Sequence, residues 1–477
     1  MFAAASRQQA SVFFALGLAL YWVLLCWGIF AEGPWAMGIN YVLFVAGIAA
    51  LFSVHAGEKR LDARHWPWII PIVLLALSYG LYDNPFIKMV NVLVLPPLFC
   101  CYRVAVTTPH YDKIAWEGSW IEHLIRRFFG ALAGIGTAIE TIARTIVPFE
   151  ARHAKTFHKV LLGLAIFIVL AAFIFIPLLS SADPAFAQLI QSVVDAVWNI
   201  LSITGVFRTL FFIALAVGLT SIMLRWNLSH AFKGKEQRST IDDVISGVVL
   251  GGVLLLYILF LFSQLSSLWV HALPMEFSET EALVKSGFWQ LFALTAINVL
   301  MFFVYYRRTQ PTVQKILTAF TFASLLLLLS ATQRMALYVW FYGLSYEKFF
   351  ALYTVLFALI LFVYLIGCLF QKERRDIMKF LVYAFVWMYA VAAVLPTEQF
   401  IFRANAWLND RPGSRIDMAE LQMLSADVYG LVKKENNVNP ASHWAEWLEY
   451  HAQMSRDKAW YEWNVQDVKL RMIESDL

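Results

Sequence analysis

Long apolar segments separated by short polar connections dominate the first 395 residues of the chain. A helix needs about 20 largely apolar residues to cross the hydrocarbon core of a bilayer. Eleven segments approach that length and are predicted to span the membrane: 11–31, 35–55, 67–82, 86–104, 157–179, 206–226, 244–266, 287–306, 316–341, 349–370 and 378–395. The pattern predicts an all-α, polytopic membrane bundle, followed by a helical extramembrane tail after residue 395.

Two of these segments allow a second interpretation. The segment 67–82 is short and contains Pro71, and the segment 86–104 contains Lys88 and a pair of prolines. Proline interrupts the backbone hydrogen bonds of a helix. The two segments form either two spans or one re-entrant hairpin that turns at Asp83-Asn84-Pro85.

The segment 128–149 is apolar enough to resemble a span, but its apolar residues fall on a helical stripe. The stripe comprises Trp116, Ile121, Leu124, Phe128, Leu132, Ile135, Ile139, Ile142 and Ile146. Glu140 and Arg144 lie one turn apart on another face. We therefore predict an amphipathic helix on the inner leaflet, with Arg126 and Arg127 facing lipid headgroups.

Composition supports a membrane protein. Apolar residues make up 60% of the chain and charged residues only 15%, whereas about 25% charged residues is usual in soluble domains. A soluble protein of this size could not bury so much apolar surface. The composition excludes a soluble enzyme, a fibrous repeat, a disordered scaffold and a secreted disulfide domain.

The distribution of basic residues predicts the orientation. With the N-terminus inside, 23 Lys and Arg residues fall in the inner connections and only 4 in the outer ones. This bias is typical of cytoplasmic loops. It predicts a bacterial inner-membrane protein with its C-terminus outside, and no nucleic-acid partner. The predicted regions are 1–104 (N-terminal spans), 105–156 (cytoplasmic amphipathic segment), 157–395 (main bundle) and 396–477 (extracytoplasmic tail).

The tail is polar, and it carries a net charge of −4. Helices are expected around 417–434 and 441–473. The first is predicted to be amphipathic and capped by Asp417, with Leu421, Leu424, Val428 and Leu431 at helical spacing. Four tryptophans in the tail form either a small core or a belt at the outer membrane surface: Trp444, Trp447, Trp460 and Trp463. Membrane lipids are the expected partners, together with envelope proteins that contact the tail.

Sequence motifs for catalysis or cofactor binding are not found. The chain has no metalloprotease, phosphate-loop, nucleophile-elbow or dinucleotide-binding motif. The four cysteines have no zinc-ligand spacing and are expected to be buried thiols: Cys26, Cys100, Cys101 and Cys368. We expect neither a metal nor a cofactor.

Ionisable residues at membrane depth are the best candidates for a site, because they are unfavourable there. Arg334 lies in the outer half of a predicted span, and Asp183 follows the outward end of another. We predict that these two residues pair, with Gln333, Gln290 and Asn298 completing a polar cluster. Alternatively, Arg334 extends to the outer headgroups.

Several motifs resemble a known family: SSADPAF, SGFWQLFAL, RMALYVWFYGLS, NAWLNDRPGSRIDMAELQMLSADVYGL and WYEWN. They are similar to a bacterial polytopic membrane family known as domain of unknown function four-one-seven-three, with a relative numbered four-one-five-three. The resemblance covers roughly residues 160–470. It implies an inner-membrane location and a helical fold, and no catalytic residues. The matching positions are Ser181, Asp183, Phe186, Arg334, Tyr338, Tyr342, Gly343, Leu344, Asn405, Asp417, Leu424, Ser425 and Asp427.

Together these features favour a non-enzymatic envelope scaffold or sensor. The alternative is a transporter or lipid-handling protein with a polar site around Arg334 and Asp183. An intramembrane enzyme is the least favoured class, because no acid–base constellation is visible in the sequence.

Overall fold

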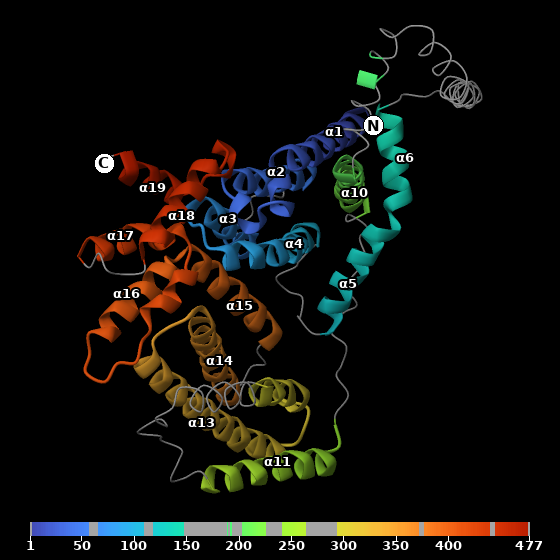
Figure 1. The fold of residues 1–477 in the computed structure, drawn as a ribbon. Coiled ribbons are helices and arrows are strands. Elements are labelled where there is room, and N and C mark those ends of the chain that lie inside the picture. The colour runs from blue at the N-terminus through green and yellow to red at the C-terminus, as the bar shows by residue number, and fades with distance from the viewer. Residues whose placement is uncertain are drawn as a thin grey trace.

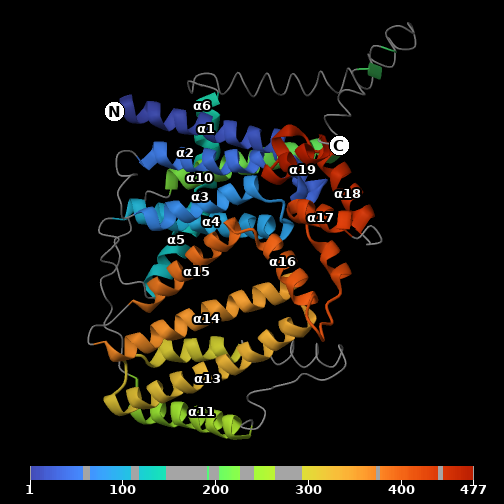
Figure 2. The ribbon, with the colours of Figure 1, turned by 90° about the vertical axis from the view of Figure 1, so that its left-hand side faces the viewer.

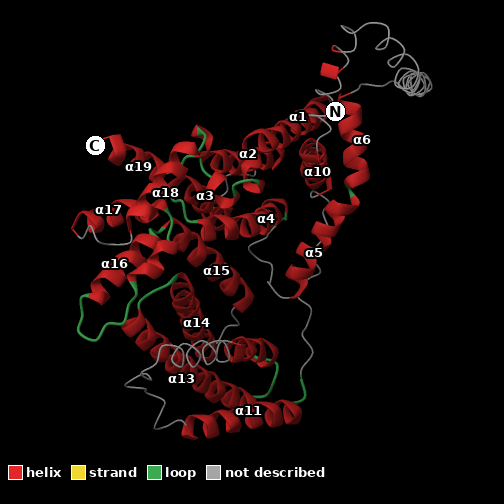
Figure 3. Ribbon diagram, viewed as in Figure 1, coloured by secondary structure: helices red, strands yellow, loops and turns green. Residues whose placement is uncertain are grey.

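The computed structural model describes residues 2–56, 65–108, 118–146, 188, 191–192, 203–225, 241–263, 293–371, 376–438 and 444–475. Every regular element in these ranges is a helix, drawn in red in Figure 3. The all-α class is therefore confirmed for the part of the chain that is described.

Ten of the eleven predicted spans coincide with helices. They are α1 (Phe2–Leu25), α2 (Ile39–Ala56), α3 (Trp66–Leu81), α4 (Pro85–Thr107), α10 (Ile203–Arg225), α11 (Asp243–Ser263), the helix Ala293–Tyr305, α13 (Pro311–Tyr342), α14 (Tyr346–Phe370) and α15 (Ile377–Val394). Six of them are long and apolar enough to cross a bilayer, namely α4, α10, α11, α13, α14 and α15. The described helices therefore indicate a multi-pass membrane protein. The predicted span 157–179 lies outside the described residues.

The segment 67–104 forms two helices, α3 and α4, joined by a turn at residues 82–84. Asn84 caps α4, because its side chain accepts a hydrogen bond from the backbone N–H of Ile87 at 3.0 Å. Pro85 occupies the first turn of α4, where no backbone donor is needed. The sequence Asp83-Asn84-Pro85 therefore makes the turn that both interpretations require.

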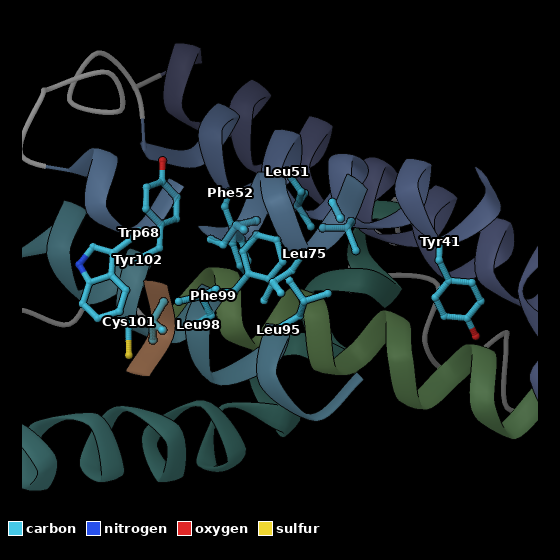
Figure 4. Packing of buried hydrophobic residues seen from close by; sticks show 14 of the residues in the cluster. Tyr41, Leu51, Phe52, Trp68, Leu75, Leu95, Leu98, Phe99, Cys101 and Tyr102 are labelled. Carbon is cyan, nitrogen blue, oxygen red and sulfur yellow. The ribbon is translucent and has the colours of Figure 1, made fainter. Parts of the chain in front are cut away.

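The helices form two packed groups. One core joins α1, α2, α3, α4, α10 and α15, and Figure 4 shows part of it around Phe52, Leu75 and Phe99. A second set of cores joins α11, the helix Ala293–Tyr305, α13 and α14. Figure 2 shows the two groups at opposite ends of the view, with α15 between them. Contacts within each group are mainly apolar, and buried hydrogen bonds such as those of Tyr389 with Asn91 and of Tyr257 with Asn298 add to them.

Helices α5 (Gly118–Ala133) and α6 (Ile135–Ile146) run across the direction of α1 in both Figure 1 and Figure 2. They present three different faces. The face packed on the other helices includes Trp120, Arg127, Ala131 and Ala138. The exposed apolar face consists of Ile125, Phe128, Phe129, Leu132, Ile135 and Ile139. The charged face carries the exposed ion pairs Glu122–Arg126 and Glu140–Arg144, each at 2.5 Å.

The prediction that Arg127 faces lipid headgroups is wrong. Arg127 is buried and donates hydrogen bonds to the hydroxyls of Thr107 at 2.5 Å and Thr108 at 3.3 Å, at the C-terminal end of α4. The helical repeat explains the error, because neighbouring residues point about 100° apart and cannot share a face. Arg126 is exposed, whereas Arg127 fixes α5 to α4.

The C-terminal tail departs from the two helices predicted for it. Its elements are α16 (Thr397–Asn409), η8 (Met418–Met423), η9 (Ala426–Val428), α17 (Tyr429–Val438), α18 (Trp444–Asp457), η10 (Trp460–Glu462) and α19 (Val465–Ser475). Helix α16 was not predicted. Asp417 caps the short η8 through the backbone N–H of Ala419, so it does not begin an α-helix. The predicted stripe still faces inward, with Leu421, Leu424 and Val428 buried and Leu431 half-buried.

The tail has its own core and lies over the turns at one end of the helices (Figure 2). Trp444 and Trp447 are buried in this core, whereas Trp460 is 66% exposed. At the turn between α1 and α2, the backbone N–H of Ile39 donates to the carbonyl of Trp463 at 3.0 Å. A Cβ atom on Gly38 would collide with the backbone of Glu462 and Trp463. The tail therefore docks on this turn through a close backbone approach.

We expect Gly38→Ala to destabilise the protein by about 1–3 kcal/mol, since the added methyl group meets backbone that cannot move aside. Thermal unfolding in lipid nanodiscs measures this effect. Gly218→Ala in α10 is the control, because nothing lies within 4 Å of the added carbon. Equal melting temperatures for the two variants would contradict the close approach.

Candidate functional site

The carboxylate of Asp83 joins the turn between α3 and α4 to the C-terminal tail. Asp83 is 1% exposed, and its Oδ1 accepts hydrogen bonds from three side chains. Lys88 Nζ donates at 2.7 Å, Lys458 Nζ at 3.0 Å and Asn464 Nδ2 at 3.0 Å. Lys88 belongs to α4, whereas Lys458 and Asn464 lie between α18 and α19. One buried carboxylate therefore holds two parts of the chain that are 375 residues apart.

The residues between α18 and α19 form the tail's part of this contact. Asn464 Oδ1 accepts from the backbone N–H groups of Gln466 at 2.8 Å and Asp467 at 3.1 Å, which caps α19. Asp467 in turn accepts a hydrogen bond from the backbone N–H of Asn464 at 3.0 Å, and also one from Lys458 Nζ at 3.0 Å. Lys458 is therefore held between Asp83 and Asp467.

A second pair of carboxyl groups extends the site into α16 and η9. Asp427 Oδ1 accepts from the backbone N–H of Asp83 at 2.6 Å. Glu398 Oε2 accepts from the backbone N–H of Ser425 at 2.7 Å and from its hydroxyl at 2.6 Å. The Ser425 hydroxyl oxygen in turn accepts from the backbone N–H of Asp427 at 3.3 Å. Ser425 therefore links the two acids.

We call the six charged groups of this site the charge cluster: Asp83, Lys88, Glu398, Asp427, Lys458 and Asp467. All six are buried, and four carboxyl groups face only two ammonium groups. Burying a charge is unfavourable unless it is paired and hydrogen-bonded. The cluster therefore cannot hold all four carboxyl groups ionised without a large free-energy penalty.

The pKa values of these acids are shifted in opposite directions. Burial acts to raise the pKa of Asp83, but Lys88 and Lys458 outweigh it and hold that pKa below its usual range. Burial, together with the charge of Asp427, raises the pKa of Glu398 well above its usual range. Burial also raises the pKa of Asp427, to about 7, with the charge of Asp83 contributing and the Asp83 N–H opposing.

Burial and neighbouring charges also shift the pKa values of the groups in and next to α18 and α19. Burial and the charge of Asp83 raise the pKa of Asp467 in spite of Lys458. Burial acts to lower the pKa of Lys458, but Asp83 and Asp467 raise it above its usual value. His451 in α18 is buried, which lowers its pKa and favours the neutral ring. Asp83 and Lys458 are therefore the charged pair at the centre of the cluster.

A second contact fixes α16 to the turn between α13 and α14. The buried side chain of Asn405 accepts from the backbone N–H of Leu344 at 2.6 Å and donates to its carbonyl at 2.7 Å. Gly343 precedes Leu344 with φ +72°, and a Cβ atom there would collide with the Asn405 side chain. This turn therefore requires glycine.

The predicted polar cluster around Arg334 is only partly described. Arg334 and Gln333 are half-buried on α13. Asn298 is buried, and its amide oxygen accepts a hydrogen bond from the hydroxyl of Tyr257 on α11. Asp183 and Gln290 lie outside the described residues, so the pairing of Arg334 with Asp183 stays a prediction.

Sequence reasoning missed most of the charge cluster, although signals for part of it were present. Lys88 is an ionisable residue inside a long apolar segment, and the turn at Asp83 was identified without a role. Ser425, Asp427 and Asn405 were among the motif positions. Glu398, Lys458 and Asp467 carried no signal, because acidic and basic residues are common in a polar tail. Within the described ranges, no three His, Cys, Asp or Glu side chains are placed to hold a metal ion.

Residues 69–434 match a family model described as "Domain of unknown function (DUF4153)". The match begins at α3, well before the region around residue 160 where the motifs were found, and it includes Asp83 and Lys88. No curated protein and no solved structure shows significant similarity to the chain.

We expect Asp83→Ala to destabilise the docked tail by about 3–5 kcal/mol, because it leaves two buried lysines without their shared partner. Trypsin cleavage of the tail and thermal unfolding in nanodiscs would both report the loss. The double variant Asp83→Asn with Lys88→Met should recover part of it, since one unpaired charge is removed. The role of Asp83 would be refuted by a single variant as stable as the wild type.

Proposed function

The chain belongs to the family of domain of unknown function DUF4153, and we propose that it is a non-enzymatic scaffold or sensor of the bacterial inner membrane. In this proposal the C-terminal tail is extracytoplasmic, and it docks on the outer ends of the membrane helices. The observation that carries the proposal is the charge cluster, in which Asp83 binds both Lys88 of a membrane helix and Lys458 of the tail.

Three separate contacts support a firmly docked tail. The tail meets the turn between α1 and α2 at Gly38, the turn between α3 and α4 at Asp83, and the turn between α13 and α14 at Leu344. These turns come from both groups of membrane helices. A change in the tail would therefore reach both groups, which is the property that a scaffold or a sensor needs.

The positions of basic residues support the proposed orientation. The three turns under the tail lie at one end of the helices, and the segments rich in Lys and Arg connect the opposite ends. These segments follow α2 and α4 and precede α13 and α15. Because basic connections favour the cytoplasm, the tail lies outside.

Helices α5 and α6 support the same orientation from the other side. They follow the basic end of α4, and they carry an exposed apolar face beside an exposed charged face. A helix in the plane of the inner membrane surface needs these two faces, one for acyl chains and one for water. The third face, with Trp120 and Arg127, holds the pair on the bundle.

The hydrogen bonds of the charge cluster favour a structural role over catalysis. Asp83 and Lys458 bind each other and their neighbours, and Lys458 is also held by Asp467. A catalytic acid or base must reach a substrate in a pocket. The tail offers exposed apolar side chains for partner contacts instead, at Met423, Tyr450 and Trp460.

Reporter fusions test the orientation. We expect alkaline phosphatase fused after Leu477 to be active, because that enzyme folds only outside the cytoplasm, and green fluorescent protein at the same position to be dark. A fusion after Gln371, between α14 and α15, should give the opposite pair of results. A fluorescent C-terminal fusion would overturn the proposed position of the tail.

Complementation of a deletion strain tests the function. We expect truncation after Leu395 and Asp83→Ala both to fail to complement the deletion phenotype, and Arg334→Ala to complement it. Immunoblots of isolated membranes control for protein level. Loss of function in Arg334→Ala alone would favour the transporter or lipid-handling alternative, and would contradict a role carried by the tail.

A further inference from the structure

Glu398 and Asp427 are the two members of the charge cluster without an ammonium partner. Lys88 binds Asp83, and Lys458 binds Asp83 and Asp467. Within the described residues, neither Glu398 nor Asp427 forms a salt bridge, although both are buried. With every group ionised, the cluster would hold two more negative than positive charges in a site closed to water.

Glu398 shows where this excess is concentrated. Its side chain is 1% exposed, and only Oε2 accepts hydrogen bonds, both of them from Ser425. The other oxygen, Oε1, is buried and has no hydrogen-bond partner among the described residues. A carboxylate oxygen left in this state loses its hydration without compensation. A bound proton removes the charge and with it most of that penalty.

We propose that Glu398 and Asp427 form a proton-binding carboxyl pair, and that the bound proton determines how firmly the tail docks on the turn between α3 and α4. Ser425 connects the two acids, and Asp427 accepts the backbone N–H of Asp83 directly. The pair therefore lies between α16, which follows the last membrane helix, and the central carboxylate of the site. The ligand of this site is the proton.

The direction of the pH dependence follows from linkage. The pKa of Asp427 in the folded protein is raised to about 7, from 3.8 when exposed. Between these values the docked tail binds a proton that the undocked tail releases, so docking weakens as pH rises. Above pH 7 the ionised Asp427 repels the carboxylate of Asp83. Docking is therefore firmest in mild acid and weakest in mild alkali.

The other groups that face the pair do not reverse this direction. Asp83 stays ionised because its pKa is lowered, and Lys458 stays protonated because its pKa is raised. Burial lowers the pKa of His451 and holds the ring neutral. Asp467, whose pKa is raised, acts in the same direction as Asp427. The titratable and charged groups around the pair are Tyr82, Asp83, Lys88, His451, Lys458 and Asp467.

This inference depends on the proposed function only for the compartment whose pH the carboxyl pair detects. With the tail outside, the pair responds to the pH of the envelope, and the proposed sensor detects acid. With the tail inside, the same chemistry would respond to the pH of the cytoplasm. Proton binding by the pair and the position of the tail can therefore be tested separately.

Infrared difference spectroscopy of the purified full chain in nanodiscs tests proton binding. We expect the C=O band of protonated carboxyl groups to lose intensity between pH 5 and 9, with one midpoint near 7 from Asp427. Asp427→Asn should remove that transition while keeping an acceptor for the Asp83 N–H, and Glu398→Gln should remove intensity that persists to higher pH. Glu435→Gln and Asp457→Asn, at exposed acids of the tail, are the matched controls and should change nothing.

Hydrogen exchange of the tail tests the coupling to docking. We expect the exchange rate of α16 and η9 to rise at least about tenfold from pH 5.5 to 8.5 after correction for intrinsic chemistry. The reason is that each pH unit between 5.5 and the Asp427 pKa of about 7 changes the docking equilibrium about tenfold. The double variant Glu398→Gln with Asp427→Asn should lose most of this rise and keep only the contribution of Asp467.

The proposal is overturned by a protonated-carboxyl band that is absent at pH 5.5, by a band that the two variants leave unchanged, or by exchange that does not depend on pH. Loss of this band on addition of sodium ions at constant pH would show that the site binds a metal cation instead of a proton, and it would also overturn the proposal. If a C-terminal reporter lies in the cytoplasm while the carboxyl groups still titrate as expected, the proposed function is overturned. Proton binding by the carboxyl pair is then still supported.

Discussion

The buried carboxylate of Asp83 is the interaction on which the arrangement of the tail depends. It binds Lys88 at the start of a membrane helix and Lys458 in the tail, and it orients Asn464, which caps α19. A buried ion pair contributes little net stability, because desolvation offsets the attraction. Its effect is on specificity, since any other position of the tail would leave Asp83 bound to Lys88 alone and would remove Lys458 from its carboxylate partner.

Apolar packing could not provide that specificity alone. The membrane helices are covered with similar Leu, Phe and Val side chains, and lipid replaces one apolar neighbour by another with little change in free energy. The contacts that fix the tail are instead polar and directional: Asp83 with Lys458, Asn405 with Leu344, and the backbone of Ile39 with Trp463. Each one satisfies a group that would otherwise be buried without a partner.

The same specificity leaves an excess of acid at the junction. Two lysines serve four carboxyl groups, and the two left over, Glu398 and Asp427, have neighbours that tolerate a neutral acid better than an ion. Protein interiors often retain such groups where a change of protonation has a use. A docking contact built around a shared carboxylate is thereby also a contact that pH can weaken.

The sequence by itself determined the helical class, the positions of ten apolar helices and the amphipathic character of α5 and α6. These properties depend on local composition and on the helical period of 3.6 residues, and both can be read from a single segment of the sequence. The turn at Asp83 and the inward stripe of Leu421 and Leu424 could be recognised for the same reason. Only the tertiary structure decided that Arg127 is buried, that the tail begins with α16, and that α18 and α19 break where Lys458 and Asn464 meet Asp83. Those outcomes depend on partners up to 381 residues away, and a local pattern carries no information about which distant charge will neutralise a buried one.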